Sequence, residues 1–364
     1  MRALQGITVV AVEQAVSAPY ASMRLTDAGA RVIKVERPEG DFARFYDDAA
    51  AGQSSYFVWL NRGKDSVALD LAAPAGRDAL AALIAGADVL IQNLKPGALD
   101  RTGLAPAALR AANPRLIACA ITGYGRTGPM ADRKAYDLLI QAESGLCSVT
   151  GGPETPARVG ISVVDIATGA AAHAAILEAL IRRGLTGQGA EIEVSMFDVM
   201  AKWLTVPLLN HLAGRPPRRM GLAHPSIAPY GVFTARDGGQ VLIAVQNDRE
   251  WAALCAGFLG DAALARDPRH AANLARITHR ADTDALVAAA FARQDAAAAI
   301  AALTAAGIAL ASVNDMAGLA AHPHLRMMTV ETPAGPVSLP APPVRVADEA
   351  FACGPVPALP EPGT

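Results

Sequence analysis

Short apolar runs rich in β-branched residues alternate with helical segments through the first half of this 364-residue chain. The run Gly6-Ile-Thr-Val-Val-Ala-Val12 predicts a buried strand, because strands covered on both faces are apolar throughout. The alternation continues with strands expected over 31–36, 66–71, 87–92 and 115–121, and with helices expected over 19–28, 74–85 and 106–113. Such alternation with short connections predicts an α/β fold, a parallel sheet with helices on both faces.

The second half of the chain first continues this pattern and then changes composition. It contains an expected helix over 166–183, strand over 188–195, helix over 198–212, hairpin over 230–244 and mostly helical stretch over 250–293. The hairpin is centred on Asp237-Gly238-Gly239, a typical turn sequence, and follows a break at the proline-containing segment 214–219. We therefore expect a large Rossmann-like domain over 1–215, a smaller α+β domain over 225–325 and a C-terminal segment over 326–364 that returns to the large domain.

The composition is apolar but does not predict a membrane protein. Mean hydropathy is +0.25, yet a spanning helix needs about 20 consecutive apolar residues. The most apolar runs, 170–181 and 285–300, are short or interrupted by polar residues. The net charge is −2 and no block of lysine or arginine occurs, which argues against nucleic acid as a partner. We expect neither a membrane nor a nucleic-acid partner.

The cysteines and the N-terminus both favour a cytoplasmic protein. No C-x-x-C and no Cys/His ligand spacing links the four cysteines, which are Cys119, Cys147, Cys255 and Cys353. A disulfide framework or a structural zinc site is therefore not expected. The N-terminus shows no charged region followed by an apolar run and a cleavage site, so no secretory signal is expected.

The loops after the first strand and around Gly63 lack two common nucleotide-binding motifs, and two catalytic motifs are missing from the sequence. The first strand is followed by Glu13-Gln-Ala-Val-Ser-Ala-Pro19, which lacks the G-x-G-x-x-G pattern of dinucleotide-binding proteins. Gly63-Lys64 is followed by Asp65 and has no glycine at the P-loop spacing. Neither G-x-S-x-G nor H-E-x-x-H occurs. His322-Pro-His324 fits a surface loop around a proline better than a metal pair, so no bound metal is expected.

A set of short motifs runs through nearly the whole chain in a fixed order. They are Leu4-Gln-Gly-Ile-Thr-Val-Val10, Ala28-Gly-Ala-Arg-Val-Ile-Lys-Val-Glu-Arg37, Gln92-Asn-Leu-Lys-Pro-Gly-Ala-Leu-Asp-Arg101, Ile121-Thr-Gly-Tyr-Gly-Arg-Thr-Gly-Pro129, Ala135-Tyr-Asp-Leu-Leu-Ile-Gln141, Val159-Gly-Ile-Ser-Val-Val-Asp-Ile-Ala-Thr-Gly169, Thr186-Gly-Gln-Gly189 and Ser195-Met-Phe-Asp198. No single motif is specific, but the ordered set resembles the class III CoA-transferase (CaiB/BaiF) family of formyl-CoA transferase and carnitine CoA-transferase. The resemblance implies CoA thioesters as substrates, no permanently bound cofactor, and an interlocked homodimer.

Asp165 matches the aspartate that is the nucleophile of this family. The resemblance implies that its carboxylate attacks the thioester of an acyl-CoA, which gives an aspartyl–acyl anhydride and CoA thiolate. The thiolate then attacks the aspartyl carbonyl, so that an aspartyl-CoA thioester forms and the first acid leaves; an acceptor acid reverses these steps. Only a carboxylate can serve, because both intermediates are acyl derivatives of the enzyme.

The local sequence supports a second interpretation of Asp165. It directly precedes the helix expected over 166–183, and aspartate is a favoured N-cap. The two interpretations are compatible, because the helix dipole and nearby amides would keep a capping carboxylate ionised, as a nucleophile requires.

The resemblance also implies a CoA-binding site assembled from several segments. Val16 and Ser17 follow the first strand, where open α/β sheets bind ligands. Arg37 would meet the adenosine end of CoA, and Lys95 and Arg101 its phosphates. The other positions expected to line the CoA channel are Leu69, Asp70, Leu71, Ala72, Asn93, Leu94, Lys134, Ala135, Tyr136 and Asp137. Solvated surface is the alternative for the basic residues, and strand core for the leucines of the 69–72 segment.

Tyr136 separates two activities within the superfamily. The related α-methylacyl-CoA racemases have a histidine here, paired with the aspartate for proton transfer at the α-carbon. A tyrosine side chain has an ordinary pKa of about 10 and is a poor base at neutral pH. A transferase is therefore favoured, with Tyr136 and Asp137 supporting Asp165, although packing alone would also explain Tyr136.

The segment Gly221-Leu-Ala-His-Pro-Ser-Ile-Ala-Pro-Tyr-Gly231 stands where formyl-CoA transferase has a run of glycines. A mobile glycine lid is therefore not expected. The segment resembles subgroups that act on succinyl-CoA and short dicarboxylic acids, which implies that His224 contacts the second carboxylate of the acid, helped by Arg218 or Arg219. A place in the turn before a proline is the alternative role of His224.

The sequence therefore predicts a CoA-transferase that moves CoA between an acyl-CoA, succinyl-CoA or a similar dicarboxylyl-CoA, and a small carboxylic acid. Two alternatives stay open. An acyl-CoA racemase or intramolecular CoA isomerase would exchange deuterium at the α-carbon without an acceptor acid. A non-catalytic acyl-CoA-binding protein would bind CoA tightly without turnover.

Overall fold

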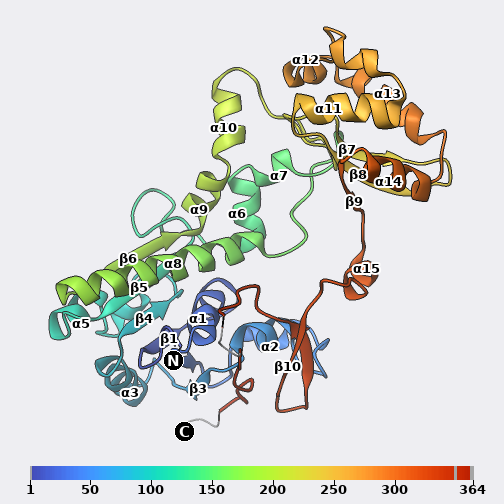
Figure 1. Ribbon diagram of the computed structural model, residues 1–364. Coiled ribbons are helices and arrows are strands. Elements are labelled where there is room, and N and C mark those ends of the chain that lie inside the picture. The colour runs from blue at the N-terminus through green and yellow to red at the C-terminus, as the bar shows by residue number, and fades with distance from the viewer. Residues whose placement is uncertain (1, 348–350, 361–364) are drawn as a thin grey trace. The chain divides into compact units, whose positions relative to one another are not determined.

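A six-stranded parallel sheet forms the centre of the first part of the structure, a computed structural model that describes residues 2–347 and 351–360 (Figure 1). The strands are β1 (Thr8–Val12), β2 (Arg31–Glu36), β3 (Asp65–Ala68), β4 (Val89–Gln92), β5 (Ile117–Thr122) and β6 (Glu191–Ser195). Their order is β3-β2-β1-β4-β5-β6, and every neighbouring pair is parallel. This is the Rossmann order, in which the topology switches between β1 and β4 and leaves a crevice at their carboxyl ends. The expectation of a Rossmann-like parallel sheet is confirmed.

Helices cover both faces of the sheet, because successive strand residues point to opposite sides. Val9 of β1 belongs to the core shared with α1 (Ser17–Asp27) and α8 (Val163–Thr186). The next residue, Val10, belongs to the core shared with α3 (Pro74–Ala85) on the other face. Burial on both sides is the reason that residues 9–12 of β1 are apolar without interruption.

α8 is the longest helix of the described residues and packs along the sheet. By length and composition alone it is apolar enough to span a membrane, as are α13 (Arg280–Phe291) and α14 (Ala296–Ala305) taken together as one bent segment. One face of α8, which includes Val164 and Ile176, is buried against α1 and β5. Packing inside the protein therefore accounts for the apolar residues on this face of the helix.

The remaining helices between residues 42 and 212 are shorter. They are η1 (Phe42–Phe45), α2 (Ser55–Asn61), α4 (Ala98–Arg101), α5 (Pro106–Ala112), α6 (Asp137–Glu143), α7 (Leu146–Val149), α9 (Met196–Trp203) and α10 (Thr205–Leu212). The last two occupy the stretch expected as one helix over 198–212. The helix breaks at Leu204 because Pro207 has no N–H to bond the carbonyl of Trp203 and its ring occupies the space of that bond.

The C-terminal segment forms a hairpin and then an extended stretch. β10 (Met327–Val330) pairs antiparallel with β11 (Val337–Pro340). Val330 and Val356 join a small apolar cluster with Phe57 of α2. This segment therefore packs on residues near the start of the chain.

The chain divides into two compact units. The first comprises Met1–Leu146, Arg158–Leu208 and Arg326–Thr364, and the second comprises Cys147–Ala157 and Leu209–Leu325. Within the C-terminal segment expected over 326–364, positions 348–350 and 361–364 lie outside the described residues.

The second unit combines an antiparallel sheet with helices. Its elements are β7 (Tyr230–Thr234), β8 (Gln240–Ala244), α11 (Asp248–Leu254), η2 (Cys255–Leu259), η3 (Ala262–Arg266), α12 (Asn273–Thr278), α13, α14, β9 (Ala309–Ser312) and α15 (Met316–Ala320). β7 and β8 form the expected hairpin, and Gly238 in its turn adopts a positive φ of 82° that favours glycine. Trp251 and Phe291 are fully buried in the core of this unit.

Candidate active site

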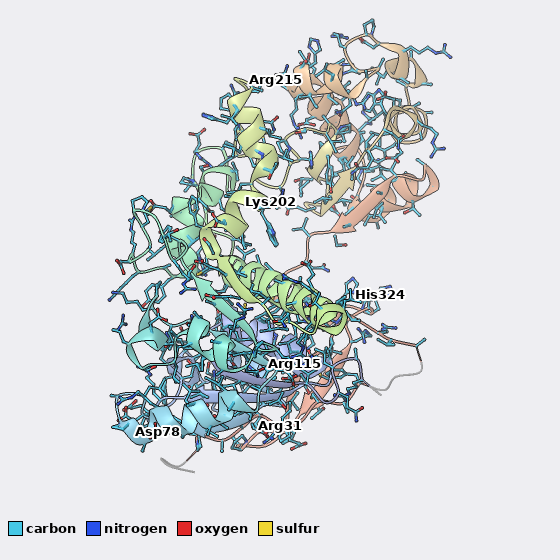
Figure 2. The ribbon with its side chains drawn as sticks, turned by 90° about the vertical axis from the view of Figure 1, so that its left-hand side faces the viewer. Arg31, Asp78, Arg115, Lys202, Arg215 and His324 are labelled. Carbon is cyan, nitrogen blue, oxygen red and sulfur yellow. The ribbon has the colours of Figure 1, made fainter. Side chains whose placement is uncertain are left out.

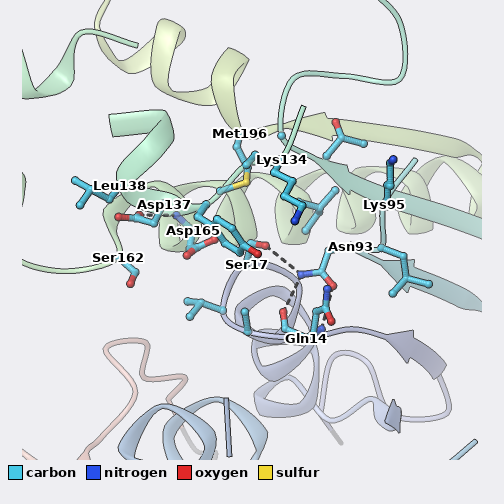
Figure 3. Close-up of a pocket in the computed structure, with 18 of the residues that line it drawn as sticks. Gln14, Ser17, Asn93, Lys95, Lys134, Asp137, Leu138, Ser162, Asp165 and Met196 are labelled. Carbon is cyan, nitrogen blue, oxygen red and sulfur yellow. Dashed lines mark hydrogen bonds between the residues drawn. The ribbon is translucent and has the colours of Figure 1, made fainter. Parts of the chain in front are cut away.

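A cavity of about 710 Å³ opens in the first unit at the carboxyl ends of β1, β4 and β5. Residues 14–17 after β1, 93–96 after β4 and 121–123 at the end of β5 form one part of its wall. The stretch 131–138 and the beginning of α8, with Asp165, complete it (Figure 3). Ligands of open α/β sheets bind at this position, because loops and helix N-termini converge at the switch point.

The structure brings most of the expected site residues together. Ten of them line this cavity: Val16, Ser17, Asn93, Leu94, Lys95, Lys134, Ala135, Tyr136, Asp137 and Asp165. A second cavity of about 360 Å³ is lined by the five others from this edge of the sheet, Arg37, Leu69, Asp70, Leu71 and Ala72. The two cavities share Gln14 and Leu94. Arg101 lines neither of them; it is an exposed residue of α4.

Asp165 lies half-buried in the first turn of α8. The helix begins at Val163 with Ser162 as its N-cap residue, so the expected N-cap position of Asp165 is wrong. Among the described residues no group donates a hydrogen bond to its carboxylate. Burial, and then the negative charge of Asp137, raise the pKa of Asp165 to about 7. The expectation that the helix N-terminus keeps this carboxylate firmly ionised is therefore also wrong.

The N-terminus of α8 is capped from another helix, by Asp137 at the start of α6. Its Oδ1 accepts hydrogen bonds from the backbone N–H of Val164 at 2.8 Å and of Asp165 at 3.3 Å. Its Oδ2 accepts one from the side-chain amide of Gln141 at 2.7 Å. Figure 3 shows the Asp137 and Asp165 side chains next to each other. Asp137 thus occupies the amides that would otherwise stabilise a charge on Asp165.

Aromatic side chains form part of the cavity wall. Tyr136 was the one aromatic residue among those expected at the site. Phe42, Tyr46 and Tyr56 line the cavity as well, and Tyr46 packs edge-on against Tyr56 with 5.5 Å between ring centroids. Burial raises the pKa of Tyr46 to about 12, so its phenol stays a hydrogen-bond donor. Aromatic residues make up only 5% of the chain, so their clustering over 42–59 is the signal that would have found this wall.

The loop after β1 is fastened from two sides. Asn93 accepts a hydrogen bond from the Gln14 N–H at 3.0 Å and donates one to the Gln14 carbonyl at 2.8 Å (Figure 3). Asp41 accepts one from the Ala15 N–H at 3.2 Å. Ala15 has a φ of 63°, a left-handed conformation that costs an alanine about 1 kcal/mol. The Asn93 amide therefore holds the loop in place within the fold.

Four fully buried charged residues lie beside this loop, and we call Glu13, Lys34, Asp41 and Lys64 the buried charge cluster. Lys64 Nζ lies 2.6 Å from Glu13 Oε1, and Lys34 Nζ lies 2.9 Å from Asp41 Oδ2. Lys34 Nζ is also 3.6 Å from Glu13 Oε1. The loop that lacks a glycine-rich sequence is thus stabilised by two carboxylates and two ammonium groups. Desolvation is the main reason that the pKa of Lys64 falls to about 8.

Cationic side chains without a carboxylate partner among the described residues line the two cavities. Arg37, Lys95, Lys134 and Arg158 are exposed, and no carboxylate of the described residues lies within ion-pair distance of them. Elsewhere on the first unit, charged side chains of both signs are spread over the surface, as Arg31, Asp78 and Arg115 illustrate (Figure 2). Unpaired cations that face a cavity favour an anionic ligand.

His224 belongs to the second unit, and its contacts with Ser226, Tyr230 and Arg280 lie within that unit. Its Nδ1 accepts a hydrogen bond from the Ser226 N–H at 3.1 Å, and its ring stacks on Tyr230 with 5.2 Å between centroids. Arg280 donates to the His224 carbonyl at 2.6 Å. Burial, and then the charge of Arg280, lower the pKa of His224 below its ordinary value. The ring is therefore neutral at pH 7, with its proton on Nε2.

The remaining sequence candidates also have defined surroundings. Arg219 donates hydrogen bonds to the carbonyls of Gly152 and Pro153, both at 3.0 Å, so its guanidinium is used within the second unit. The rings of His322 and His324 lie 5.8 Å apart in an exposed turn. Across residues 2–347 and 351–360, no group of three or more His, Cys, Asp or Glu side chains is placed to hold a metal ion.

Comparison with known proteins identifies the family. The family model described as CoA-transferase family III matches residues 4–363. The chain is 41% identical over 294 residues, 78% of this chain and 73% of the relative, to the succinate–glutarate CoA-transferase of Agrobacterium fabrum. It is 38% identical over 348 residues, 94% of this chain and 88% of the relative, to the acetyl-CoA:oxalate CoA-transferase of Acetobacter aceti.

A solved structure agrees with these relatives. The crystal structure of a CaiB/BaiF family protein from Brucella suis matches with a TM-score of 0.82 and 38% identity, over 99% of this chain and 97% of that one. Sequence and fold thus agree over almost the full length. The chain belongs to CoA-transferase family III and is an enzyme of that class.

Proposed function

We propose that this enzyme moves CoA from succinyl-CoA, or a similar dicarboxylyl-CoA, to a small dicarboxylic acid, with Asp165 as the nucleophile. One observation carries the proposal: Asp165 presents a carboxylate that accepts no hydrogen bond from the described residues to a cavity at the switch point of the sheet, and its pKa is raised to about 7. A poorly solvated carboxylate is a stronger nucleophile than a well-solvated one, and about half of it is ionised at neutral pH.

The first half of the reaction loads CoA onto the enzyme. An Asp165 oxygen attacks the thioester carbonyl of the donor, the C–S bond breaks, and an aspartyl–acyl anhydride and CoA thiolate result. The thiolate attacks the Asp165 carbonyl carbon, and the bond from that carbon to the bridging oxygen breaks. The donor acid then leaves with the bridging oxygen, and Asp165 carries CoA as a thioester.

The second half transfers CoA to the acceptor. A carboxylate oxygen of the acceptor acid attacks the aspartyl-CoA carbonyl and expels the thiolate, which again gives an anhydride. The thiolate now attacks the acceptor carbonyl and forms the new acyl-CoA. Asp165 is regenerated with one oxygen that came from the acceptor. Charge is conserved in each step, since every carboxylate or thiolate consumed is matched by one released.

The surroundings of Asp165 support this role. Asp137 accepts both N–H groups at the beginning of α8 that would otherwise lower the energy of an ionised Asp165. Tyr46 keeps its proton and Tyr136 is 61% exposed, so both phenols are available as donors to a substrate oxygen. No step of the reaction requires a base. This fits a site whose wall has Tyr136 at the position where a racemase needs histidine.

We propose that CoA occupies the two cavities together. Gln14 and Leu94 line both cavities, so one ligand with an adenosine end, a pyrophosphate and a pantetheine arm would reach from one into the other. We place the adenosine end in the smaller cavity, beside Arg37 and the 69–72 segment. Lys95 and Lys134 then meet the phosphates and the thioester arm from the larger cavity. Asn93 and Asp41 contribute indirectly, because they fasten the loop that separates the two cavities.

The identity of the acids rests on the relatives and on His224. Glutarate and oxalate, which appear in the names of the two relatives, are both dicarboxylic acids. His224 presents an Nε2–H for which no described residue is an acceptor, and a neutral N–H donor is suited to the second carboxylate of such an acid. We assign His224 this contact. Arg219, whose guanidinium already binds backbone carbonyls, has no part in it.

We also propose that two chains form an interlocked homodimer. Helices α9 and α10 carry large exposed apolar side chains, including Trp203 at 62% and Val206 at 65% exposure, and a second copy of the chain would cover them. Light scattering behind size exclusion should give twice 37.5 kDa. A mass of one chain at micromolar concentration contradicts this assembly. A cytoplasmic location stays a prediction from the sequence.

Trapping of the acyl-enzyme tests the mechanism. The enzyme is incubated with succinyl-CoA without an acceptor, quenched with hydroxylamine, digested and examined by mass spectrometry. We expect a hydroxamate on the peptide that contains Asp165, and none in Asp165→Ala. If Asp165 is never modified and Asp165→Ala still exchanges CoA between acids, the mechanism is wrong. Deuterium uptake at the α-carbon of an acyl-CoA without an acceptor acid would instead indicate a racemase.

A further inference from the structure

Gln141 is a fully buried residue of α6, one helical turn after Asp137. It lines neither cavity and was not among the residues expected at the site. Its side-chain nitrogen Nε2 donates to Asp137 Oδ2 at 2.7 Å, and also lies 3.4 Å from the Ile161 carbonyl. Its oxygen Oε1 accepts from the Val159 N–H at 2.9 Å. One amide therefore connects α6 to the segment that leads directly into α8.

This pattern uses both ends of the Gln141 amide and determines the geometry of its neighbours. The Asp137 carboxylate accepts three hydrogen bonds, two from backbone N–H groups of α8 and one from the side-chain amide of Gln141. Together these bonds leave the carboxylate one favourable orientation. The same amide fixes residues 159–161, four to six positions before Asp165. A displacement at either place would change the distance between the Asp137 and Asp165 carboxylates.

We propose that Gln141 is a positioning residue for the nucleophile: its buried amide fixes the Asp137 carboxylate on the first amides of α8 and fastens the 159–161 segment to α6, so that Asp165 is held in place at the cavity wall. This inference rests on the proposed role of Asp165. It adds a residue that touches no substrate and acts through Asp137. Because such effects depend on sub-ångström placement, the loss of the Gln141 amide should reduce turnover far more than substrate binding.

Gln141→Leu tests the proposal with a side chain of similar size that forms no hydrogen bonds. The matched control is Thr168→Val, which removes another fully buried hydrogen bond, to the Val164 carbonyl at 2.7 Å, from the same helix as Asp165. We expect kcat of Gln141→Leu to fall about 30-fold with KM for succinyl-CoA within about twofold, whereas Thr168→Val keeps kcat within about twofold.

The pH profile separates positioning from a general loss of stability. When Asp137 is released from the α8 amides, these amides become available to Asp165 and stabilise its ionised form. The pH at which kcat/KM is half-maximal should therefore move toward acid by about one unit in Gln141→Leu, and should not move in Thr168→Val. Equal pH midpoints in all three proteins, or a kcat of Gln141→Leu within about twofold of wild type, would overturn the proposal.

An exchange of the two side chains decides the matter if Gln141→Leu does not fold. Asp137→Asn alone sets two amide NH₂ groups against each other, and Gln141→Glu alone sets two carboxylates against each other. In the double variant the amide introduced at position 137 donates to the carboxylate introduced at position 141, so the contact within α6 is restored. We expect the double variant to be at least about fivefold more active than the product of the two single effects predicts. A double variant with no such recovery contradicts the proposal.

Failure of the inference is distinguishable from failure of the proposed function. Hydroxylamine trapping on the wild type is measured in parallel. If Asp165 is not acylated in the wild type, the proposed function is wrong. If Asp165 is acylated and the Gln141 variants match Thr168→Val, only the positioning role is wrong.

Discussion

The buried charge cluster beside β1 and the carboxylate pair of Asp137 and Asp165 differ in whether their charges have partners of opposite sign. In the cluster each carboxylate has an ammonium group at 2.6 or 2.9 Å, and all four side chains are sealed from solvent. In the carboxylate pair no cation of the described residues lies within ion-pair distance, and the pKa of Asp165 is raised to about 7.

The two groups therefore have different roles at the same edge of the sheet: the buried charge cluster stabilises the fold, and Asp165 is the reactive group. Removal of one member of the cluster would leave a buried charge without a partner, so the cluster is necessary for the folded state. Asp165 instead raises the free energy of the folded state at neutral pH, because its charge is poorly solvated and faces another carboxylate. An uncompensated charge such as that of Asp165 therefore indicates the reactive group. The compensated charges of the buried charge cluster stabilise the loop beside it.

Replacement of the nucleophile should have the largest effect. Asp165→Asn should reduce turnover at least about 1000-fold, because asparagine cannot form the anhydride. The same change should raise the free energy of unfolding at about pH 8 by ~2 kcal/mol, roughly half of what a pKa shift of this size implies, since the side chain is partly exposed. Asp78→Asn, at an exposed position of α3, is the control and should change neither quantity. A destabilised Asp165→Asn contradicts the comparison.

The buried charge cluster should respond in the opposite sense. Glu13→Gln leaves Lys34 and Lys64 with less compensation and should lower the free energy of unfolding by about 3 kcal/mol in urea titrations. The exposed pair of Arg31 and Asp65, 2.9 Å apart, provides the control, and Asp65→Asn should cost less than about 1 kcal/mol. The comparison fails if the two variants are equally stable.

The pH dependence should show the raised pKa of Asp165 in two ways. Activity requires the ionised form, so kcat/KM should fall about tenfold per pH unit below about pH 7. In the unfolded chain the ordinary pKa of 3.8 applies, so the folded state binds the proton more tightly than the unfolded state between these values. The stability advantage of Asp165→Asn should thus grow from about pH 4 to about pH 7 and stay constant above. If the stability advantage of Asp165→Asn shrinks between about pH 4 and about pH 7, the pKa of Asp165 is lowered in the folded state and not raised.

The smallest effects should come from the unpaired cations at the cavities. Lys134→Met removes a charge from the cavity wall and should raise KM for succinyl-CoA about fivefold at low salt, with kcat within about twofold. Arg101→Met should change KM by less than about twofold, because Arg101 lines neither cavity. Initial rates over a range of salt concentrations measure both. A larger effect of Arg101→Met would mean that CoA extends beyond the two cavities.

Much of the fold was predictable from local patterns. β1, β4 and β5 are almost entirely apolar, and β2 is rich in valine and isoleucine, so the apolar runs and the β-branched residues were sufficient to find these four strands. The beginning of α8 was not found, because Val163 and Val164 are poor helix formers and suggested a start at 166. The helix begins earlier since Asp137, 27 positions before Val164, supplies the cap.

The site was predictable where a motif carries a reactive group and not where contacts join distant segments. Asp165 and Asp137 both stand in motifs of the family. Gln141 is in one of the same motifs, but its role depends on a segment 18 and 20 positions further along the chain. Lys64 resembles an ordinary surface lysine in the sequence, and only the packed fold shows its contact with Glu13, 51 positions away. Long-range contacts of this kind leave no local pattern.

Heavy-oxygen labelling tests the central claim most directly. The enzyme is allowed to turn over succinyl-CoA with glutarate labelled in its carboxylate oxygens, and the peptide that contains Asp165 is examined by mass spectrometry. The mechanism predicts that Asp165 acquires an acceptor oxygen during turnover, because the anhydride oxygen stays on the enzyme when the thiolate attacks the acceptor carbonyl. Complete conversion of labelled glutarate to its CoA thioester with Asp165 left unlabelled would contradict the account.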